Sequence, residues 1–499
     1  MSQHPEFDKY RQLLRQQAAE EATLKLPEGQ LSARQRLKLL YDQGEYRELF
    51  RFARAPEARN WQDGIVCAHG LVHGRPVAAY ATEVQVQGGS QGMLQTRQIA
   101  ELYRLARNSG IPMVAMLQSG GARISEAFHI SEGFVPPMRE AIAASSVIPQ
   151  IACAFGHCIG AAALMATLGD FIVMEASATM SIAGARVNRS ATGENLSEEQ
   201  LGGVEIHTRD TGNVHFVCQG EAATLARARE LLRWLPSNQA EPPPRFESHD
   251  PAERAVPSLL DLIPNDDTTP FDIRALIRAI ADDGRFFEVQ AEFAPNLVTG
   301  FASFGGETMA IVANQSLHLA GALDPAAARK CSRFLNWITN FNYPLLSLVD
   351  VPGAMPTLAA QQQGMLIHAA QVLQSLYQVR GLKVSIVVRR CFGGTYGMLN
   401  PKSGEGDLVY AYPNAMIGVM NDAAMTTVLS QSEQGKAQVE KLHAAGLRLD
   451  DPLLGAANLY LDDIIDPADT RRVIIGALRS FGTKRITHYP PKLFPNFPI

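Results

Sequence analysis

The chain has 499 residues, enough for two or more domains, and its composition is that of an ordinary globular protein. A formal net charge of −5 without basic clusters argues against nucleic-acid binding. The N-terminal sequence MSQHPEFDKY lacks the apolar core of a signal peptide, and no uncharged apolar run is long enough to span a membrane. The six cysteines form no CxxC pair, so we expect no metal site and a cytoplasmic protein with reduced thiols.

Helices are predicted for residues 1–60, because charged and apolar residues alternate there at helical spacing. A further predicted helix ends at Trp234, before a segment that contains the run Pro242–Pro244. Consecutive prolines cannot continue a helix and favour an extended chain. The predicted organisation is therefore an N-terminal domain at 1–235, a Pro-rich linker at 236–270 and a C-terminal domain at 271–499.

The two predicted domains show the same patterns in the same order. Each has a hairpin-like run of alternating apolar residues, then a proline, a buried-type strand and a glycine turn, then a second strand that leads into a helix start. The matching segments are 70–80, 111–121 and 149–156 in the first half and 300–312, 343–353 and 383–390 in the second. Gly120 and Gly160 lie 40 residues apart, as do Gly353 and Gly393. These patterns predict an α/β fold built by internal duplication of ββα units, with mainly parallel sheets and a site between the halves.

Small residues follow the second strand in each half, in GHCIGAAALM from Gly156 and in CFGGTYGMLN from Cys391. The first N–H groups of a helix have no partner within the helix and lie at its positive end. We therefore predict that the N–H groups of Gly160 and Ala161, and those of Gly394 and Thr395, bind developing oxyanions. The alternative is that small residues here only permit close packing of helix on strand.

A glycine-rich turn follows the first buried strand. Its residues Ser119, Gly120, Gly121, Ala122 and Arg123 are predicted to hold a thioester and its phosphates through backbone amides and the guanidinium group. The absence of Lys-Ser/Thr after the glycines excludes a Walker A loop. The alternative for the arginine is an ion pair with Glu126 on a helix surface.

Nucleophilic catalysis is not indicated, because the chain has no Gly-x-Ser-x-Gly elbow and no evident acid/base carboxylate pair. Histidines outside a recognisable constellation are more often structural than catalytic. His157, which lies within the first small-residue segment, is the best candidate for a functional one.

From Leu31 to Arg472 the chain resembles the carboxyltransferase family of acyl-CoA carboxylases, above all the β subunits of propionyl-CoA and methylcrotonyl-CoA carboxylases. The matching motifs are specific in combination. They are Gly88-Gly-Ser90, Ser119-Gly-Gly-Ala-Arg-Ile124, Leu201-Gly-Gly203, Val349-Asp-Val-Pro-Gly353 and Gly393-Gly-Thr-Tyr396.

The resemblance implies two crotonase-like domains and a site where opposite domains of two chains meet, in a homo-oligomer such as a dimer or hexamer. It implies transfer of a carboxyl group from N1-carboxybiotin to the α-carbon of an acyl-CoA. Gly160 and Ala161 would hold the thioester enolate, and Gly394 and Thr395 the ureido oxygen of biotin. Gly353, Ala354 and Gly393 would lie on the biotin side. No biotin-acceptor Ala-Met-Lys-Met stretch is present, so biotin and the biotin carboxylase would be on partner chains.

Departures from the family pattern gather at the predicted site. His157 replaces a proline, Ala161 the second glycine of the oxyanion pair and Thr395 an alanine. Tyr396 is followed by Gly397, at a position where the family has larger side chains that line the acyl pocket, which predicts room for an acyl group larger than acetyl. Three functions stay open: a biotin-dependent acyl-CoA carboxyltransferase, a biotin-independent decarboxylase or decarboxylative condensing enzyme, and a non-catalytic subunit that binds CoA or a partner.

Overall fold

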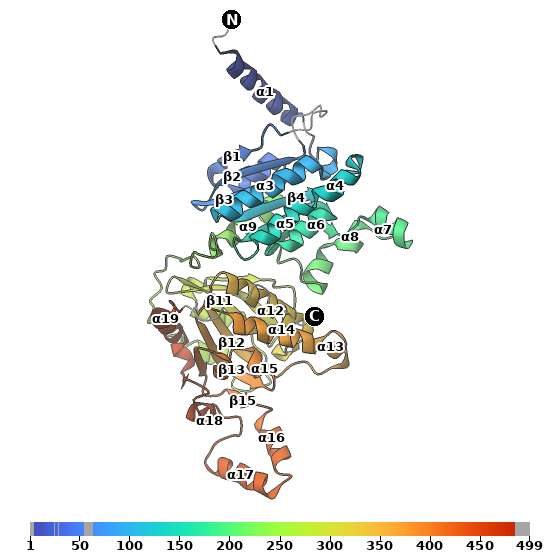
Figure 1. The fold of residues 1–499 in the computed structure, drawn as a ribbon. Coiled ribbons are helices and arrows are strands. Elements are labelled where there is room, and N and C mark those ends of the chain that lie inside the picture. Colours follow the sequence, from blue (N-terminus) through green and yellow to red (C-terminus); the bar gives the residue numbers. More distant parts are fainter. Residues whose placement is uncertain (1–3, 24, 28, 54–62, 485–499) are drawn as a thin grey trace. The chain divides into compact units, whose positions relative to one another are not determined.

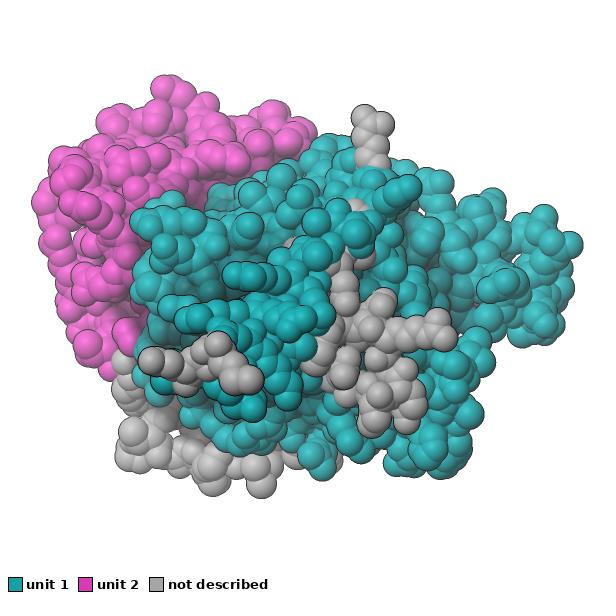
Figure 2. Space-filling model, turned by 90° about the horizontal axis from the view of Figure 1, so that it is seen from above, with its two compact units in different colours: residues 1–241 teal, residues 242–499 magenta. Residues whose placement is uncertain are grey.

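The computed structural model describes residues 4–23, 25–27, 29–53 and 63–484. The chain forms two compact units, Met1–Glu241 and Pro242–Ile499, which are coloured separately in Figure 2. Residues 242–270, predicted as linker, belong to the second unit. Val256, Leu259 and Ile263 from this segment are part of its hydrophobic core. No helix among the described residues combines the length and apolar character needed to cross a membrane.

The described part of unit 1 contains one eight-stranded sheet in the order β1-β2-β3-β4-β5-β6-β8, with β7 paired to β5. The first three strands are antiparallel and the rest are parallel. The strands are β1 Tyr46–Leu49, β2 Ile65–Val72, β3 Arg75–Thr82, β4 Met113–Ser119, β5 Gln150–Ile159, β6 Phe171–Glu175, β7 Thr179–Ser181 and β8 Phe216–Cys218. The helices are α1 Pro5–Ala22, α2 Ala33–Leu40, α3 Met93–Ser109, α4 Phe128–Gly133, α5 Val135–Ala144, α6 Ala161–Leu168, α7 Ala185–Thr192, α8 Glu198–Gly202 and α9 Glu221–Trp234.

The described part of unit 2 has the same topology, with the order β9-β10-β11-β12-β13-β14-β16 and β15 paired to β13. Its strands are β9 Phe286–Val289, β10 Leu297–Phe304, β11 Glu307–Asn314, β12 Leu345–Val351, β13 Lys383–Phe392, β14 Leu408–Ala411, β15 Met416–Gly418 and β16 Asp463–Ile464. Its helices are α10 Leu259–Leu262, α11 Ile273–Ile280, α12 Pro325–Asn340, α13 Leu358–Gln362, α14 Met365–Gln378, α15 Thr395–Met398, α16 Asp422–Leu429, α17 Glu433–Ala444, α18 Pro452–Ala457 and α19 Thr470–Phe481. The shared strand order confirms the predicted duplication.

Local sequence explains the main elements. Every residue of β4 and of β12 is buried, as expected for central parallel strands with helices over the sheet, and Figure 1 shows α3 and α12 lying against the two sheets. Ser32 begins α2 with a reciprocal capping box, and the carboxylate of Asp324 caps α12. The prediction of helices only for residues 1–60 is wrong at β1, where tertiary pairing with β2 overrides the local pattern.

An ion pair is repeated in the two units. Arg34 bonds Glu48 through two contacts of 2.7 and 3.0 Å, across 14 residues. Arg274 bonds Glu288 through two contacts of 2.7 and 2.6 Å, also across 14 residues. In each case the arginine is on the last helix before the sheet, α2 or α11, and the glutamate is on the first strand, β1 or β9. Two-point arginine–carboxylate pairs fix geometry, so the repeat ties the same two elements together in both halves.

The strand register gives the equivalence of the glycine turns. Ser119 pairs with Cys158 in unit 1, and Val351 pairs with Cys391 in unit 2. Two residues further along, Gly121 therefore matches Gly353, and Gly160 matches Gly393. The predicted match of Gly120 with Gly353 is one residue out of register. The left-handed φ of 103° at Gly121 and 139° at Gly353 agrees with this assignment.

Candidate active site

The first candidate turn joins β5 to α6 through Gly160, whose φ of 65° and ψ of −121° are accessible to glycine but not to a side-chain residue. The N–H of Gly160 donates to the carbonyl of Ser181 on β7 at 2.9 Å. That group is therefore already used within the fold. The N–H of Ala161, the first residue of α6, meets no acceptor among the residues that the structure describes, as is usual for a donor at a helix start.

The glycine-rich turn after β4 supplies a second free donor beside it. Of the four N–H groups from Gly120 to Arg123, that of Ala122 is the one with no acceptor within the described part of the chain. The others donate to the carbonyl of Gly88 at 3.0 Å, the Oγ of Ser119 at 3.2 Å and the carbonyl of Gln91 at 2.9 Å. A Cβ at Gly121 would lie 3.8 Å from Ile159 Cγ2, so this turn runs next to the end of β5.

The corresponding turn of unit 2 has the same arrangement. The N–H of Gly393 donates to the carbonyl of Gly418 on β15 at 2.9 Å, while the N–H groups of Gly394 and Thr395 find no acceptor in the described residues. Gly394 has a φ of −64°, and a Cβ there would meet no atom within 4 Å. The backbone therefore does not require glycine at this position. The missing side chain leaves the approach to the N–H open.

The turn after β12 in unit 2 corresponds to the glycine-rich turn after β4 in unit 1. Leu323 donates its N–H to Gly353 at 3.1 Å and accepts that of Met355 at 2.8 Å. The N–H of Ala354, between these two, has no acceptor among residues 4–23, 25–27, 29–53 and 63–484. Each unit thus presents one free N–H from the turn after its fourth strand and at least one from the turn after its fifth strand. Backbone N–H groups are the kind of donor that an oxyanion hole uses.

Arg123 is buried between carboxylates. Its Nη1 contacts Asp63 Oδ1 at 2.6 Å and Glu126 Oε1 at 3.2 Å, and its side chain is only 8% exposed. Nη2 donates to the carbonyl of Ser90 at 3.1 Å. The alternative ion pair with Glu126 is thus present, although buried. A guanidinium group committed in this way ties the turn to its surroundings and is poorly placed to meet a phosphate.

The remaining predicted residues line the two turns in different ways. His157 on β5 is exposed, and its Nδ1 lies 2.8 Å from the hydroxyl of Thr179. Tyr396 is partly buried, and this burial raises the pKa of its hydroxyl. Gly397 has an ordinary φ, and a Cβ there would lie 3.6 Å from Leu373 Cδ2, a normal contact. Its lack of a side chain is therefore not a requirement of the backbone.

A cavity of about 630 Å³ opens beside the second turn. It lies between β15, α18 and the start of α15, and its wall is mostly apolar. The residues of the wall include Gly393, Tyr396, Ile417, Val419, Leu454 and Leu461. This volume is within the range of small-molecule sites. Sequence reasoning missed this wall except for Gly393 and Tyr396, because α18 and β15 carry no motif.

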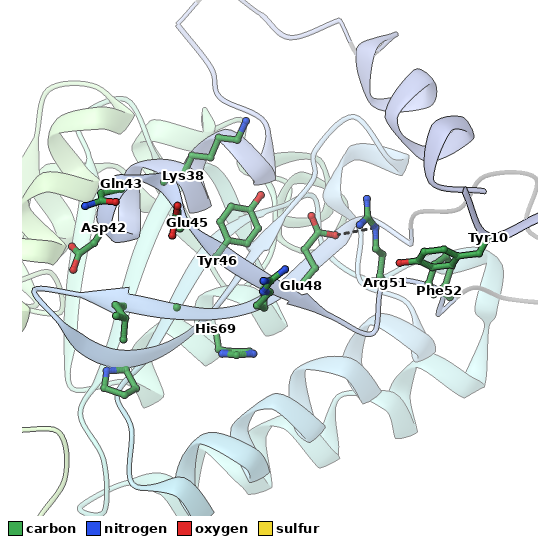
Figure 3. Close-up of a pocket in the computed structure, with 15 residues that line it drawn as sticks. Tyr10, Lys38, Asp42, Gln43, Glu45, Tyr46, Glu48, Arg51, Phe52 and His69 are labelled. Atoms are coloured by element: carbon green, nitrogen blue, oxygen red, sulfur yellow. Dashed lines mark ion pairs between the residues drawn. The ribbon is translucent and has the colours of Figure 1, made fainter. Parts of the chain in front are cut away.

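A second hollow, of about 1240 Å³, lies in unit 1 at the sheet edge formed by β1 (Figure 3). It is lined mainly by charged and polar side chains, among them Lys38, Asp42 and His69, and Figure 3 marks the 3.7 Å ion pair of Glu48 with Arg51. The sheet order places β2, β3 and β4 between this edge and β5. The hollow contains none of the predicted site residues, so we do not assign the active site to it.

Large apolar side chains are exposed next to both turns. Ile182 follows β7 and is 73% exposed, and its equivalent Val419 follows β15 and is also 73% exposed. Ile124 and Phe128 in unit 1 and Leu358 and Leu366 in unit 2 are exposed as well. Neighbouring apolar side chains of this kind commonly mark a surface that is covered in an assembly.

Two α/β units of the same topology thus carry equivalent glycine-containing turns at the ends of their fourth and fifth strands. Residues 24–497 match the family model of the carboxyl transferase domain, and the chain belongs to this family. It is an enzyme of the acyl-CoA carboxyltransferase type, as the sequence predicted.

The relatives cover nearly the whole chain. The methylmalonyl-CoA carboxyltransferase 12S subunit of Propionibacterium freudenreichii subsp. shermanii is 36% identical over 486 residues, with 94% of this chain and 92% of the relative covered. The propionyl-CoA carboxylase beta chain of Roseobacter denitrificans is 33% identical, with 94% of both chains covered. The methylmalonyl-CoA decarboxylase subunit alpha of Veillonella parvula is 34% identical, with 95% of this chain and 94% of the relative covered.

The fold is similar to solved structures. A crystal structure of the transcarboxylase 12S hexamer with hydrolysed methylmalonyl-coenzyme A bound superposes with a TM-score of 0.92 at 34% identity, and 98% of each chain is covered. A second, with methylmalonyl-coenzyme A and methylmalonic acid bound, also gives 0.92, at 35% identity and 99% coverage of each chain. These similarities confirm the predicted pair of crotonase-like domains.

Proposed function

We propose that this enzyme transfers a carboxyl group between biotin on a separate carrier protein and the α-carbon of an acyl-CoA, through an enolate. The observation that carries the proposal is the repeated set of free N–H groups at matching turns. The reaction has two carbonyl partners, the thioester and the biotin ureido group, and each develops negative charge on oxygen. One donor set for each partner meets that requirement.

In unit 1, Ala161 and Ala122 donate to the thioester oxygen and stabilise the enolate. For Gly160 we propose a structural role in place of the donor role expected from the sequence. Its N–H fixes the turn to β7, and its φ of 65° lets the chain turn there from β5 into α6. Ser119, Gly120 and Gly121 hold the second turn beside it.

In unit 2, Gly394 and Thr395 donate to the ureido oxygen, with Ala354 as a further donor. The adjoining cavity of about 630 Å³ is large enough and apolar enough for a fused bicyclic ring. Biotin bound here would supply the carboxyl group and a ring nitrogen able to accept the α-proton. If biotin provides the base, the protein has only to orient the two reactants and exclude water. Small residues at both turns are compatible with this role, because it requires no catalytic side chain there.

The proposal is tested by mass spectrometry of the products formed from malonyl-, methylmalonyl- and propionyl-CoA, with and without carboxylated biotin. We expect carboxylated product from propionyl-CoA only when the donor is added, and carboxylation of free biotin by methylmalonyl-CoA. Release of CO₂ from methylmalonyl-CoA at the same rate without biotin would instead assign the chain to decarboxylases, the activity named for the Veillonella relative.

We further propose that the enzyme works as a dimer or a larger homo-oligomer in which unit 1 of one copy meets unit 2 of another. The exposed apolar side chains of Ile182 and Val419 beside the turns support this arrangement, because contact with another copy would cover them. Light scattering coupled to gel filtration should give at least twice the 54.3 kDa chain mass. A monomer with full activity would contradict this assembly.

Acyl selectivity is expected to depend on Gly397. In Gly397→Ile the new side chain would fill space near Leu373 and Tyr396, so we expect kcat/KM for longer acyl thioesters to fall about tenfold relative to shorter ones, the order of one or two excluded methylenes. The measurement compares kcat/KM for acetyl-, propionyl- and butyryl-CoA in both proteins. Gly397→Ala is the matched control, since a Cβ meets only an ordinary contact. An unchanged ratio in folded Gly397→Ile would remove this residue from the pocket.

A further inference from the structure

A buried cluster of charges lies beneath the second turn. The carboxylate of Asp350, at the end of β12, is inaccessible to solvent. Its Oδ2 contacts Arg389 Nη2 at 2.7 Å, and its Oδ1 contacts Arg390 Nε at 2.8 Å. The arginine side chains are 1% and 9% exposed. Both belong to β13, directly before the strand end that leads to Gly393.

The cluster holds one more positive charge than negative charge. Among the described residues, Asp350 forms the only ion pairs recorded for these two arginines. The other contacts of Arg389 are carbonyl groups, those of Asp266 at 2.9 Å and Thr269 at 2.7 Å. Carbonyl dipoles solvate a guanidinium group without neutralising its charge. A charge removed from water is screened much less than one at the surface, so the excess is felt at the neighbouring turn.

The equivalent place in unit 1 is electrically neutral. By register, Gln118, Gly156 and His157 replace Asp350, Arg389 and Arg390. An arginine still lies there, but it comes from α2. Arg36 bonds Gln118 at 2.5 Å and is paired with Glu221 through two contacts of 2.7 Å. Its guanidinium stacks 4.4 Å from the ring centre of Phe155, as that of Arg389 stacks 4.8 Å from Phe271. Both units thus place a buried arginine over an aromatic ring at this position, but the clusters around the arginines differ in net charge.

Arg390 also links the segments that frame the second turn. Its Nη2 donates to the carbonyl of Ala320 at 2.9 Å, in the loop before α12. A few residues on, Leu323 holds the turn of Gly353 and Met355. The side chain therefore connects that loop, the end of β12 and the end of β13.

We propose that Arg390 is a positioning residue that gives the second turn a net positive potential, so that this turn, and not the first, favours the anionic form of the biotin ureido group. The inference rests on the proposed function, in which unit 2 faces biotin. The N–H groups of Gly394 and Thr395 bind the developing oxyanion directly. The buried positive charge of Arg390, on the strand that leads into this turn, stabilises the same anion electrostatically.

The test compares Arg390→Gln with Arg390→Lys in the full-length enzyme, using methylmalonyl-CoA as carboxyl donor and free biotin as acceptor. The glutamine is close in shape but neutral, whereas the lysine keeps the charge. We expect kcat to fall about tenfold in Arg390→Gln, with the KM values for biotin and acyl-CoA within about twofold of wild type, and most of the rate to return in Arg390→Lys.

Arg471→Gln is the matched control. Arg471 is another fully buried arginine of unit 2, paired with Asp282 at 2.6 Å near the β10–β11 hairpin, at the opposite end of the sheet. It should lower the unfolding temperature without changing kcat. A normal kcat in Arg390→Gln, equal losses in the glutamine and lysine variants, or a raised KM for biotin with kcat unchanged would each overturn the proposal. A wild-type enzyme that carboxylates no biotin would instead contradict the proposed function.

Discussion

Replacement of Ala161 by proline is expected to reduce kcat about 100- to 1000-fold, the usual cost of one oxyanion donor, while the fold is retained. Proline removes the N–H of Ala161, which meets no acceptor among the described residues. Ala161 is the first residue of α6, the helical position that proline tolerates best, and Gly160 before it is not helical. Steady-state kinetics with the preferred acyl-CoA and the thermal unfolding midpoint are the measurements.

Ala161→Ser is the control for this variant, because it adds a polar atom but keeps the N–H. We expect its kcat to remain within a few fold of wild type. If proline and serine at this position behave alike, Ala161 is not a donor. Gly160→Val is a less informative change, because a β-branched residue cannot adopt the φ of 65° and would disturb the turn itself.

Replacement of Gly394 by proline is expected to cause a loss of similar size, confined to the reaction with biotin. Its φ of −64° already matches that of proline, and a Cβ would meet no atom within 4 Å. The variant therefore removes a donor without creating a clash. The measurements are carboxylation of free biotin by methylmalonyl-CoA and, separately, equilibrium binding of the acyl-CoA, which should stay unchanged because it belongs to the other unit.

Gly394→Ala separates the loss of the N–H from the loss of open space. It keeps the donor and adds one methyl group in the approach to it. Retained activity in the alanine variant together with a large loss in the proline variant would support the donor role. Equal loss in both would show that space, rather than the hydrogen bond, is what this glycine provides. Weakened acyl-CoA binding in Gly394→Pro would contradict the assignment of the two turns to different partners.

The sequence alone was sufficient to predict the internal duplication and the positions of the two turns. Both depend on signals that are local in the chain, namely apolar runs of strand length and glycines at fixed distances from them. The register error between Gly120 and Gly121 arose because the connection between the two central strands is one residue shorter in unit 1, where Met113 pairs with Gln150, than in unit 2, where Leu345 pairs with Lys383. An equal spacing of 40 residues between glycines therefore does not identify equivalent positions.

Other features depended on partners that are distant in sequence. The N–H of Gly160 is hydrogen-bonded to the carbonyl of Ser181 because β7 pairs with β5. The sequence around Ser181 contains no motif that predicts this pairing. Arg123 is buried because Asp63, 60 residues earlier, reaches its guanidinium group. Arg389 and Arg390 pair with Asp350, which lies 39 and 40 residues earlier in the chain. No local pattern in the sequence indicates that ion pair.

The presence of both units in a single polypeptide has an evolutionary consequence. In a symmetric dimer of identical single-unit chains, every substitution appears in both half-sites at once, so neither can specialise without changing the other. Once the two copies are fused, selection can act on each turn separately. Independent selection of this kind accounts for the difference between the neutral cluster around Gln118 and the charged cluster around Asp350. Two ancestral sites of equal chemistry could thereby become a donor site and an acceptor site within one gene.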